Sequence, residues 1–190
     1  MKINLSKTRE QFPLSVKKIY KKTFVNSIVW VIILLIAFAF VIYAKSVTET
    51  TVNNGFYNIV SMFLLTLLFI IIAINYLYQL WYFNVYYYDL TSDYIIIKKG
   101  PITPREINIP YERIQDIYVD QDIFDRIFGI YDVHLSSATI SSGMEAHIDG
   151  VEKPASEGLR NLLLKTLGEK ITRHKTTTQT PVSVPLPPQS

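Results

Sequence analysis

The chain of 190 residues contains no cysteine, which excludes disulfide bonds, thiolate zinc sites and cysteine nucleophiles. It also contains no Gly-rich phosphate-binding loop and no G-x-S-x-G nucleophile elbow. Charge is missing over two long stretches, because residues 23–44 and 50–88 include no Lys, Arg, Asp or Glu. These absences remove several common signatures of enzymes and direct attention to the two uncharged stretches.

The uncharged stretches predict two transmembrane helices, near residues 24–44 and 59–83. About 20 helical residues cross the roughly 30 Å hydrocarbon layer of a bilayer. The alternative is a pair of buried helices in a soluble core, but such helices rarely run this long without a charge. Within the second stretch, we expect Asn75 and Gln79 to form helix–helix hydrogen bonds or to lie near the interface, rather than to form a transport site.

Charge is distributed unevenly around the predicted spans. Residues 1–23 have seven Lys and Arg against one Glu, whereas residues 84–190 have 11 Lys and Arg against 14 Asp and Glu. The positive-inside rule places the basic N-terminus in the cytoplasm, and two spans return the C-terminal part to the same side. We therefore expect a multi-pass cell-membrane protein with both termini cytoplasmic and the loop 45–58 outside.

Residues 1–23 form a basic arm in which apolar and basic side chains separate at helical spacing. The apolar set recurs from Val16 through Ile19, Tyr20, Thr23 and Phe24. The opposite side carries four lysines: Lys17, Lys18, Lys21 and Lys22. The pattern predicts a cytoplasmic amphipathic helix, opened by Pro13, that lies on the inner face of the membrane. The lysines either contact anionic lipid or only determine topology, and the two interpretations are compatible.

After the second span, the hydrophobic period changes to that of strands. The expected strands are 84–90, 94–100, 105–110, 115–121, 131–135 and 145–150. Apolar residues at 123–128 follow a helical turn that Gly129 ends, and residues 136–144 form a loop.

The C-terminal part predicts one helix and a tail. The helix starts at Pro154, with Ser156 as its N-cap, and carries a stripe of leucines. The Pro- and Thr-rich residues 173–190 predict a disordered tail. One amphipathic helix is a simple way to cover the open end of a small bent sheet.

Four segments carry a resemblance to a known family: IPYERIQD at 109–116, DRIFG at 125–129, DVH at 132–134 and the approach to the helix at 150–154. With the two spans, they resemble the bacterial pleckstrin-homology (PH) family of YdbS/YdbT-like membrane proteins. The resemblance implies a PH-like fold, a bent antiparallel sheet or barrel capped by the C-terminal helix. It implies no activity and no site residue. We therefore expect an α+β membrane protein with a helical hairpin at 24–83 and a PH-like domain at 84–172.

Six carboxylates in the segment 109–135 are candidates for a metal or catalytic site: Glu112, Asp116, Asp120, Asp122, Asp125 and Asp132. Asp116 and Asp120 share a strand face but lie about 13 Å apart at the strand rise. The ligand order of an EF-hand loop is absent. We interpret the six as solvated or capping groups, with Asp122 and Asp125 beside the helical turn. We predict no metal, no cofactor and no catalytic residue.

Other polar groups give weak signals. His134 and His147 lie on predicted strands and are expected to be solvated or hydrogen-bonded rather than metal ligands. The negative charge of residues 84–190 disfavours nucleic-acid binding. Lys98 and Lys99, at the turn after the second strand, are further candidates for contact with a lipid leaflet. No small-molecule substrate is evident.

These patterns predict a non-catalytic scaffold, tethered to the lipid bilayer, that binds a protein or associates with itself. Strand edges and the aromatic segment NVYYY at 84–88 are the candidate association surface. The alternative is a sensor of anionic lipid that uses the lysines of the arm together with Lys98 and Lys99. An enzyme or transporter component is a third hypothesis, supported only by Asn75 and the acidic segment.

Overall fold

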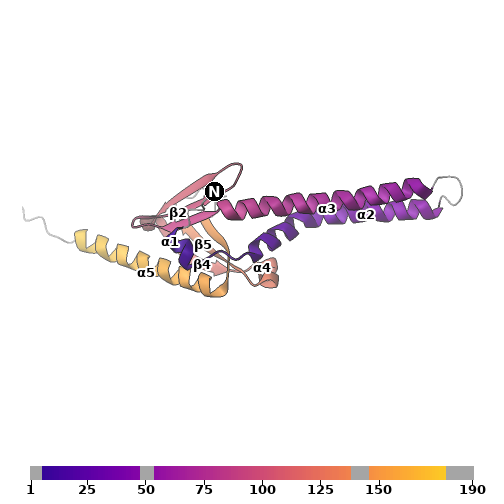
Figure 1. Ribbon diagram of the computed structural model, residues 1–190. Coiled ribbons are helices and arrows are strands. Elements are labelled where there is room, and N and C mark those ends of the chain that lie inside the picture. Colours follow the sequence, from indigo (N-terminus) through magenta and orange to yellow (C-terminus); the bar gives the residue numbers. More distant parts are fainter. Residues whose placement is uncertain (1–5, 48–53, 138–145, 179–190) are drawn as a thin grey trace, which may run out of the picture.

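The computed structural model describes residues 6–47, 54–137 and 146–178. Two long helices lie side by side and extend from one end of a small domain, while a third long helix leaves toward the opposite end (Figure 1). The elements in chain order are α1 (Lys7–Gln11), α2 (Lys17–Val47), α3 (Asn54–Val85), β1 (Tyr87–Leu90), β2 (Tyr94–Lys99), β3 (Arg105–Pro110), the 3-10 turn η1 (Tyr111–Arg113), β4 (Ile114–Asp120), α4 (Ile123–Phe128), β5 (Tyr131–Ser137), β6 (Ala146–Val151) and α5 (Lys153–Thr178).

The helices α2 and α3 are long and apolar enough to cross a membrane, judged by length and composition. Many of their large apolar side chains point away from the protein, as Phe40 and Phe69 do at 69% and 74% exposure. Core helices of a soluble protein would bury such side chains, so this surface favours the predicted hairpin over a soluble core pair. Both helices extend past the predicted spans, since α2 begins at Lys17 and α3 ends at Val85.

One polar contact joins the two helices. Asn75 Nδ2 in α3 donates a hydrogen bond to Ser27 Oγ in α2 at 2.9 Å, and Gln79 is buried one turn later. The helix–helix hydrogen bond predicted for Asn75 is therefore confirmed. The predicted outer loop 45–58 falls partly outside the described residues, because the structure leaves out 48–53.

The strands form two antiparallel sheets, ordered β1-β2-β3 and β4-β5-β6. All six predicted strands are present, and the predicted bent sheet or barrel takes the form of two sheets around one core. Alternation along each strand turns apolar side chains inward, such as Ile95 and Ile97 in β2 and Val133 and Leu135 in β5. The first strand starts later than predicted, because α3 continues through Val85.

The C-terminal helix α5 packs on β4, β5 and η1 and buries Leu159 and Leu163 completely. The helix begins at Lys153, and the Ser156 hydroxyl donates to the Lys153 carbonyl at 2.9 Å. Ser156 therefore lies inside the helix, and the prediction that it is the N-cap is wrong. The helix also runs to Thr178, past the predicted boundary at 172. The rest of the predicted tail and most of the loop 136–144 lie outside the described residues.

The short helix α4 agrees with its sequence signals. The Asp122 side chain accepts a hydrogen bond from the Asp125 N–H at 2.7 Å, and the Asp125 side chain accepts one from the Asp122 N–H at 3.4 Å. This reciprocal pair is a capping box. Gly129 then ends the helix at φ +66°, a left-handed conformation that glycine adopts without strain.

The predicted N-terminal arm is part of the folded domain. The Ser6 hydroxyl donates to the Tyr88 carbonyl, and the Leu90 N–H donates to Thr8 Oγ1 at 3.1 Å, so α1 covers the outer edge of β1. Leu14 pairs with Val151 and covers the edge of β6 in the same way. Pro13 therefore precedes an extended segment and does not open a helix, because these residues satisfy two sheet edges.

Candidate functional site at the helix–domain junction

The first turns of α2 do not separate into the predicted basic and apolar faces. Lys18 and Lys21 are only 3% and 5% exposed, whereas Tyr20 and Phe24 are 53% and 50% exposed. Lys18 and Lys21 are therefore directed into the domain and are not available to a lipid leaflet, whereas Lys17 and Lys22 of the same predicted face stay partly exposed. The physical reason is that the domain supplies carboxylates to this face.

Lys18 forms an almost fully buried ion pair with Asp149. Its Nζ lies 2.7 Å from Asp149 Oδ1 and 3.0 Å from the Asp149 carbonyl oxygen. It also lies 3.8 Å from the centre of the Tyr86 ring, a cation–π contact. Burial alone would raise the pKa of Asp149, but Lys18 and Lys22 together hold that pKa well below its usual value. Asp149 is therefore charged at neutral pH.

Gly150 allows Lys18 to reach this position. It adopts φ +79°, and a Cβ there would lie 2.6 Å from Lys18 Cδ. Its N–H donates to Asp132 Oδ1 at 2.7 Å. Burial and the neighbouring Asp149 raise the pKa of Asp132, in contrast to that of Asp149. Two carboxylates of one cluster thus have opposite pKa shifts.

Lys21 joins α2 to α4. Its Nζ contacts Asp122 Oδ2 at 2.9 Å and also binds Asp125 Oδ1. Burial raises the pKa of Asp125 in spite of Lys21. At Asp122, burial alone would raise the pKa, but Lys21 and the hydrogen bonds with Asp125 together lower it. The capping role predicted for both aspartates is confirmed, but Asp125 is 1% exposed and is not the solvated group expected.

Arg9 of α1 binds the end of α3. Its Nη2 donates to the Phe83 carbonyl at 3.1 Å, and its Nη1 donates to the Tyr86 carbonyl. The last carbonyls of a helix lack partners within the helix and carry partial negative charge, so a cation there is favourable. The domain therefore holds the near ends of both long helices by charged contacts.

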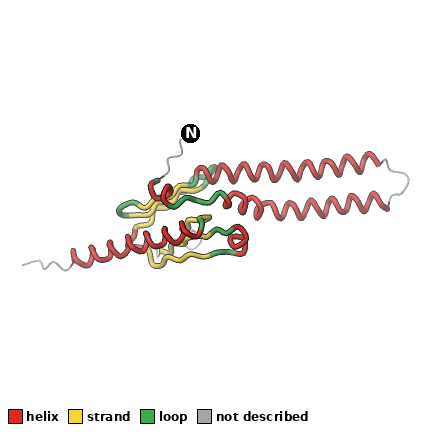
Figure 2. Tube along the Cα trace, turned by 60° about the horizontal axis from the view of Figure 1, so that its bottom comes forward, coloured by secondary structure: helices red, strands yellow, loops and turns green. Residues whose placement is uncertain are grey.

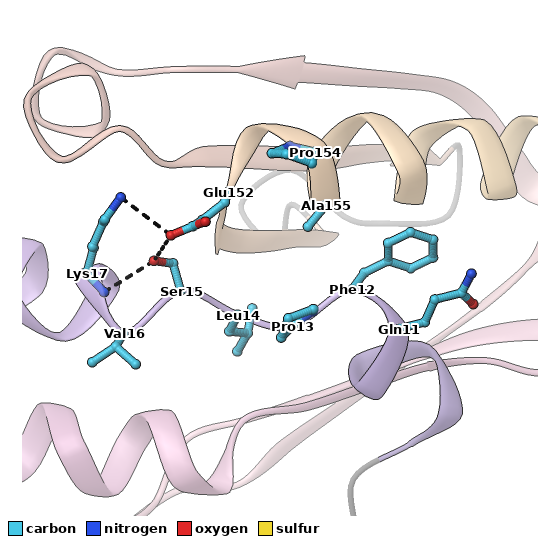
Figure 3. A pocket seen from close by; sticks show the side chains of 10 residues that line it. All are labelled: Gln11, Phe12, Pro13, Leu14, Ser15, Val16, Lys17, Glu152, Pro154 and Ala155. Carbon is cyan, nitrogen blue, oxygen red and sulfur yellow. Dashed lines mark hydrogen bonds and ion pairs between the residues drawn. The ribbon is translucent and has the colours of Figure 1, made fainter.

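A groove of about 620 Å³ lies between residues 11–17 and the start of α5 (Figure 3). At one end of the groove the two sides are joined, because Glu152 Oε1 accepts a hydrogen bond from Ser15 Oγ at 3.2 Å and pairs with Lys17 Nζ at 3.4 Å. Phe12 lies farther along, on the same side as Ser15 (Figure 3). These polar groups bind one another, which is typical of a structural joint between the N-terminal segment and α5.

The other predicted lipid-contact residues are Lys17, Lys22, Lys98 and Lys99, and each has its own charged neighbours. Lys17 pairs with Glu152, and Lys98 pairs with Glu106 at 2.9 Å with about half of each side chain exposed. Lys22 is 39% exposed and lies 3.5 Å from Asp149. Burial lowers the pKa of Lys99, and attraction to Asp149 offsets part of this effect. Lys17, Lys22 and Lys98 thus keep between about two fifths and about half of their side chains exposed.

The remaining candidates are structural. His134 Nε2 lies 3.1 Å from Asp120 Oδ1, and its ring stacks between Tyr118 and His147 across β4, β5 and β6. His134 is thus the hydrogen-bonded histidine expected. Across residues 6–47, 54–137 and 146–178, no group of three or more His, Asp or Glu side chains is arranged to hold a metal ion.

The predicted aromatic association surface is mostly core. Tyr86 and Tyr88 are fully buried, and the Tyr86 hydroxyl donates to the His147 carbonyl at 2.9 Å. Alternation turns only Tyr87 of this group toward the surface, half-buried. The segment 84–88 therefore joins the second long helix to the sheet and does not present an aromatic face.

Asp149 and Arg9 were not among the residues predicted to form a site. Asp149 lies at the end of an alternating strand next to Gly150, a position that gives no local sign of an ion pair. The available signal was the complementary charge of the two regions, since the N-terminal residues are basic and the strand domain is acidic. Complementary net charge predicts attraction but not which residues pair.

A family model described as Bacterial PH domain matches residues 13–167. The match starts in the segment that pairs with β6, includes both long helices and ends within α5, so it covers the sheets and the lysine contacts of the junction, while Arg9 precedes it. No curated protein and no solved structure matches the chain. Because the match covers most of the chain and the fold agrees with it, the chain belongs to the bacterial PH domain family.

Proposed function

We propose that this protein is a non-catalytic PH-like module that is tethered to the cell membrane and binds a protein partner or a second copy of itself. In this proposal α2 and α3 cross the membrane, and the domain and both termini are cytoplasmic, as in a YdbS/YdbT-like protein. One observation carries the proposal. The domain binds the ends of both long helices directly, through Lys18, Lys21 and Arg9, and is thereby held in one orientation.

The partner surface that we assign is the edge of β3. The N-terminal segment covers the edges of β1 and β6, and α5 packs against β4. In β3, Arg105, Glu106 and Asn108 are exposed, while Ile107 is partly buried and Ile109 is buried. An edge strand of this kind binds an added strand by backbone hydrogen bonds.

The lack of cysteine allows a direct test of the topology. A single Val47→Cys at the far end of α2 should react with a membrane-impermeant thiol reagent in intact cells. A single Asp116→Cys on β4 should react only after the cells are permeabilised. Equal reaction of both positions in intact cells would reject the tethered arrangement.

The partner surface is tested in native membranes with a photo-cross-linking amino acid at Asn108. The matched control places it at the exposed Arg160 of α5. We expect one defined cross-linked complex from position 108, of a mass given by a second copy or one recurrent protein, and none from position 160. A monomer at both positions, with lipid alone retained in the intact mass, would reject the scaffold.

A sensor of anionic lipid is the second candidate function, favoured by the partial exposure of Lys22 and Lys98 near the junction. Replacement of Lys17, Lys22, Lys98 and Lys99 by Gln should then abolish any preference of the purified chain for phosphatidylglycerol. An unchanged lipid preference would reject this function. Lys18 and Lys21 are left intact in this test, because their replacement would disturb the fold.

A further inference from the structure

Three large apolar side chains between β1 and β6 are exposed and do not pack in the hydrophobic core. Ile123 is 76% exposed, and Ile102 and Ile127 are each 69% exposed. Among the described residues outside α2 and α3, no other large apolar side chain exceeds 56% exposure. Isolated exposed apolar residues are ordinary, so the position of these three decides whether they have a role.

Two of the three lie on α4, at the point where α2 leaves the domain. The Phe124 ring packs on the Phe24 ring with centroids 6.0 Å apart, and Phe24 is the first residue of the first predicted span. Lys21 fixes α4 from the same side through Asp122 and Asp125. Ile123 and Ile127 are four residues apart and share a helix face, so both project from a fixed support.

The third isoleucine lies on the turn between β2 and β3, at the same end of the domain. Tyr87, which follows α3, is the register partner of Lys98 in β2. The ladder of β2 and β3 then ends with Lys99 opposite Arg105, and the turn follows this pair. The turn reaches back beside the start of the helical hairpin, on the other side of the hairpin from α4 (Figures 1 and 2). Its glycine, Gly100, has φ +100°, which makes the turn tight.

We propose that these two tips, Ile102 on the β2–β3 turn and Ile123 with Ile127 on α4, insert into the inner leaflet and dock the domain on the membrane. This inference rests on the proposed function, because it requires α2 and α3 to span the bilayer. The tips flank the hairpin at the level where its uncharged stretch begins, so a bilayer around the hairpin meets them. Basic side chains lie next to both tips, with Lys99 and Arg105 beside the turn and Arg126 on α4.

The chemistry of the tips fits a leaflet that contains anionic lipid. Apolar side chains at the boundary of headgroups and acyl chains are stabilised by burial, and neighbouring Lys and Arg are attracted to anionic headgroups. The two tips and the hairpin give three points of attachment, which would fix the height and tilt of the domain. The edge of β3 would then be presented to a partner in one orientation.

The test uses the full chain in vesicles of phosphatidylcholine and phosphatidylglycerol, with one cysteine introduced per variant and labelled with a fluorophore. The tip variants are Ile102→Cys, Ile123→Cys and Ile127→Cys, which are surface substitutions that leave the core intact. Leu164→Cys on α5, at 44% exposure, is the water-exposed control, and Phe40→Cys in the middle of α2 is the membrane control. Quenching is measured with nitroxide on the lipid acyl chain and, separately, with iodide in the water.

We expect the three tip positions to be quenched several-fold more by the lipid nitroxide than by iodide, with the reverse at Leu164. Quenching of the tips by iodide as at Leu164, with Phe40 still quenched by lipid, would overturn the docking but keep the membrane tether. Protection of the tips from both quenchers would overturn it in favour of a protein contact. Iodide quenching at Phe40 would instead reject the proposed function itself.

Discussion

The two parts of α2 bury different kinds of side chain, and the comparison shows how the partner decides which face turns inward. In its first turns, α2 buries Lys18 and Lys21 against the domain and leaves Tyr20 exposed. Farther along, α2 carries no charge until Lys45, and its apolar side chains point outward. Lysines turn inward only where aspartates of the domain meet them, which an amphipathic pattern alone does not reveal.

The largest effect is expected from removing the carboxylate that holds Lys18. Asp149→Asn leaves a buried ammonium group without its anion, and loss of one partner of a buried pair costs about 3–5 kcal/mol. Amide hydrogen exchange of the full chain in micelles should therefore accelerate by roughly two to three orders of magnitude over β6. Asp132→Asn is the matched control, because burial already disfavours its charged form and the Asn oxygen still accepts from Gly150.

A double variant separates charge from packing at the same position. Replacing Lys18 by Met together with Asp149→Leu removes both charges, and apolar replacement of a whole buried pair is often neutral in stability. We expect the double variant to recover most of the stability lost in Asp149→Asn. If it is as unstable as the single variant, the contact stabilises the fold through something other than charge pairing.

Acidification should weaken the same junction without a mutation. The pKa of Asp149 is lower in the fold than the unfolded value of about 3.9, so its stabilising contribution is complete above that pH. The contribution is lost as pH falls from about 4 through the lower folded pKa. Denaturant midpoints of the full chain, measured from pH 7 to pH 3, should fall less steeply below pH 4 in Asp149→Asn than in the wild type. Parallel acid profiles would contradict this linkage.

A smaller effect is expected from Gly150→Ala. The added Cβ meets the Lys18 side chain, whose atoms lie 2.6–2.8 Å from its position. The left-handed backbone adds about 1–2 kcal/mol for a residue with a Cβ. Gly168→Ala in α5 is the control, because its Cβ meets nothing within 4 Å and alanine favours a helix. Thermal unfolding should show a lower midpoint for the first variant and an equal or higher one for the second.

Local signals account for the part of the fold that could be predicted from the sequence. Alternation located the strands, and Asp122 with Gly129 marked both ends of α4, because these patterns act within a few residues. The family resemblance of the segment 109–135 indicated a PH-like fold, and these residues form η1, β4, α4 and most of β5.

The junction could not be predicted in the same way. Lys18 and Asp149 are 131 residues apart in the sequence, and their contact depends on how α2 docks on β6. The helical pattern of the arm was equally consistent with a lysine face on lipid or on protein, since it describes only which residues share a side. Arg9 gave no signal, because the helix end that it binds is supplied by α3.

The smallest effect of the series is expected at the exposed side of the Lys21 contact. Asp122→Ala removes the N-cap of α4 and one partner of Lys21, whose second partner Asp125 remains. Loss of an N-cap costs about 1 kcal/mol, and the half-exposed ion pair adds little. Glu106→Gln, which breaks the exposed pair with Lys98, is the control and should change stability by less than about 0.5 kcal/mol. Hydrogen exchange should therefore accelerate in α4 alone for Asp122→Ala, while β6 keeps its protection. If β6 loses protection as well, the contacts of Lys18 and Lys21 form one cooperative unit, and the two parts of the junction are not independent.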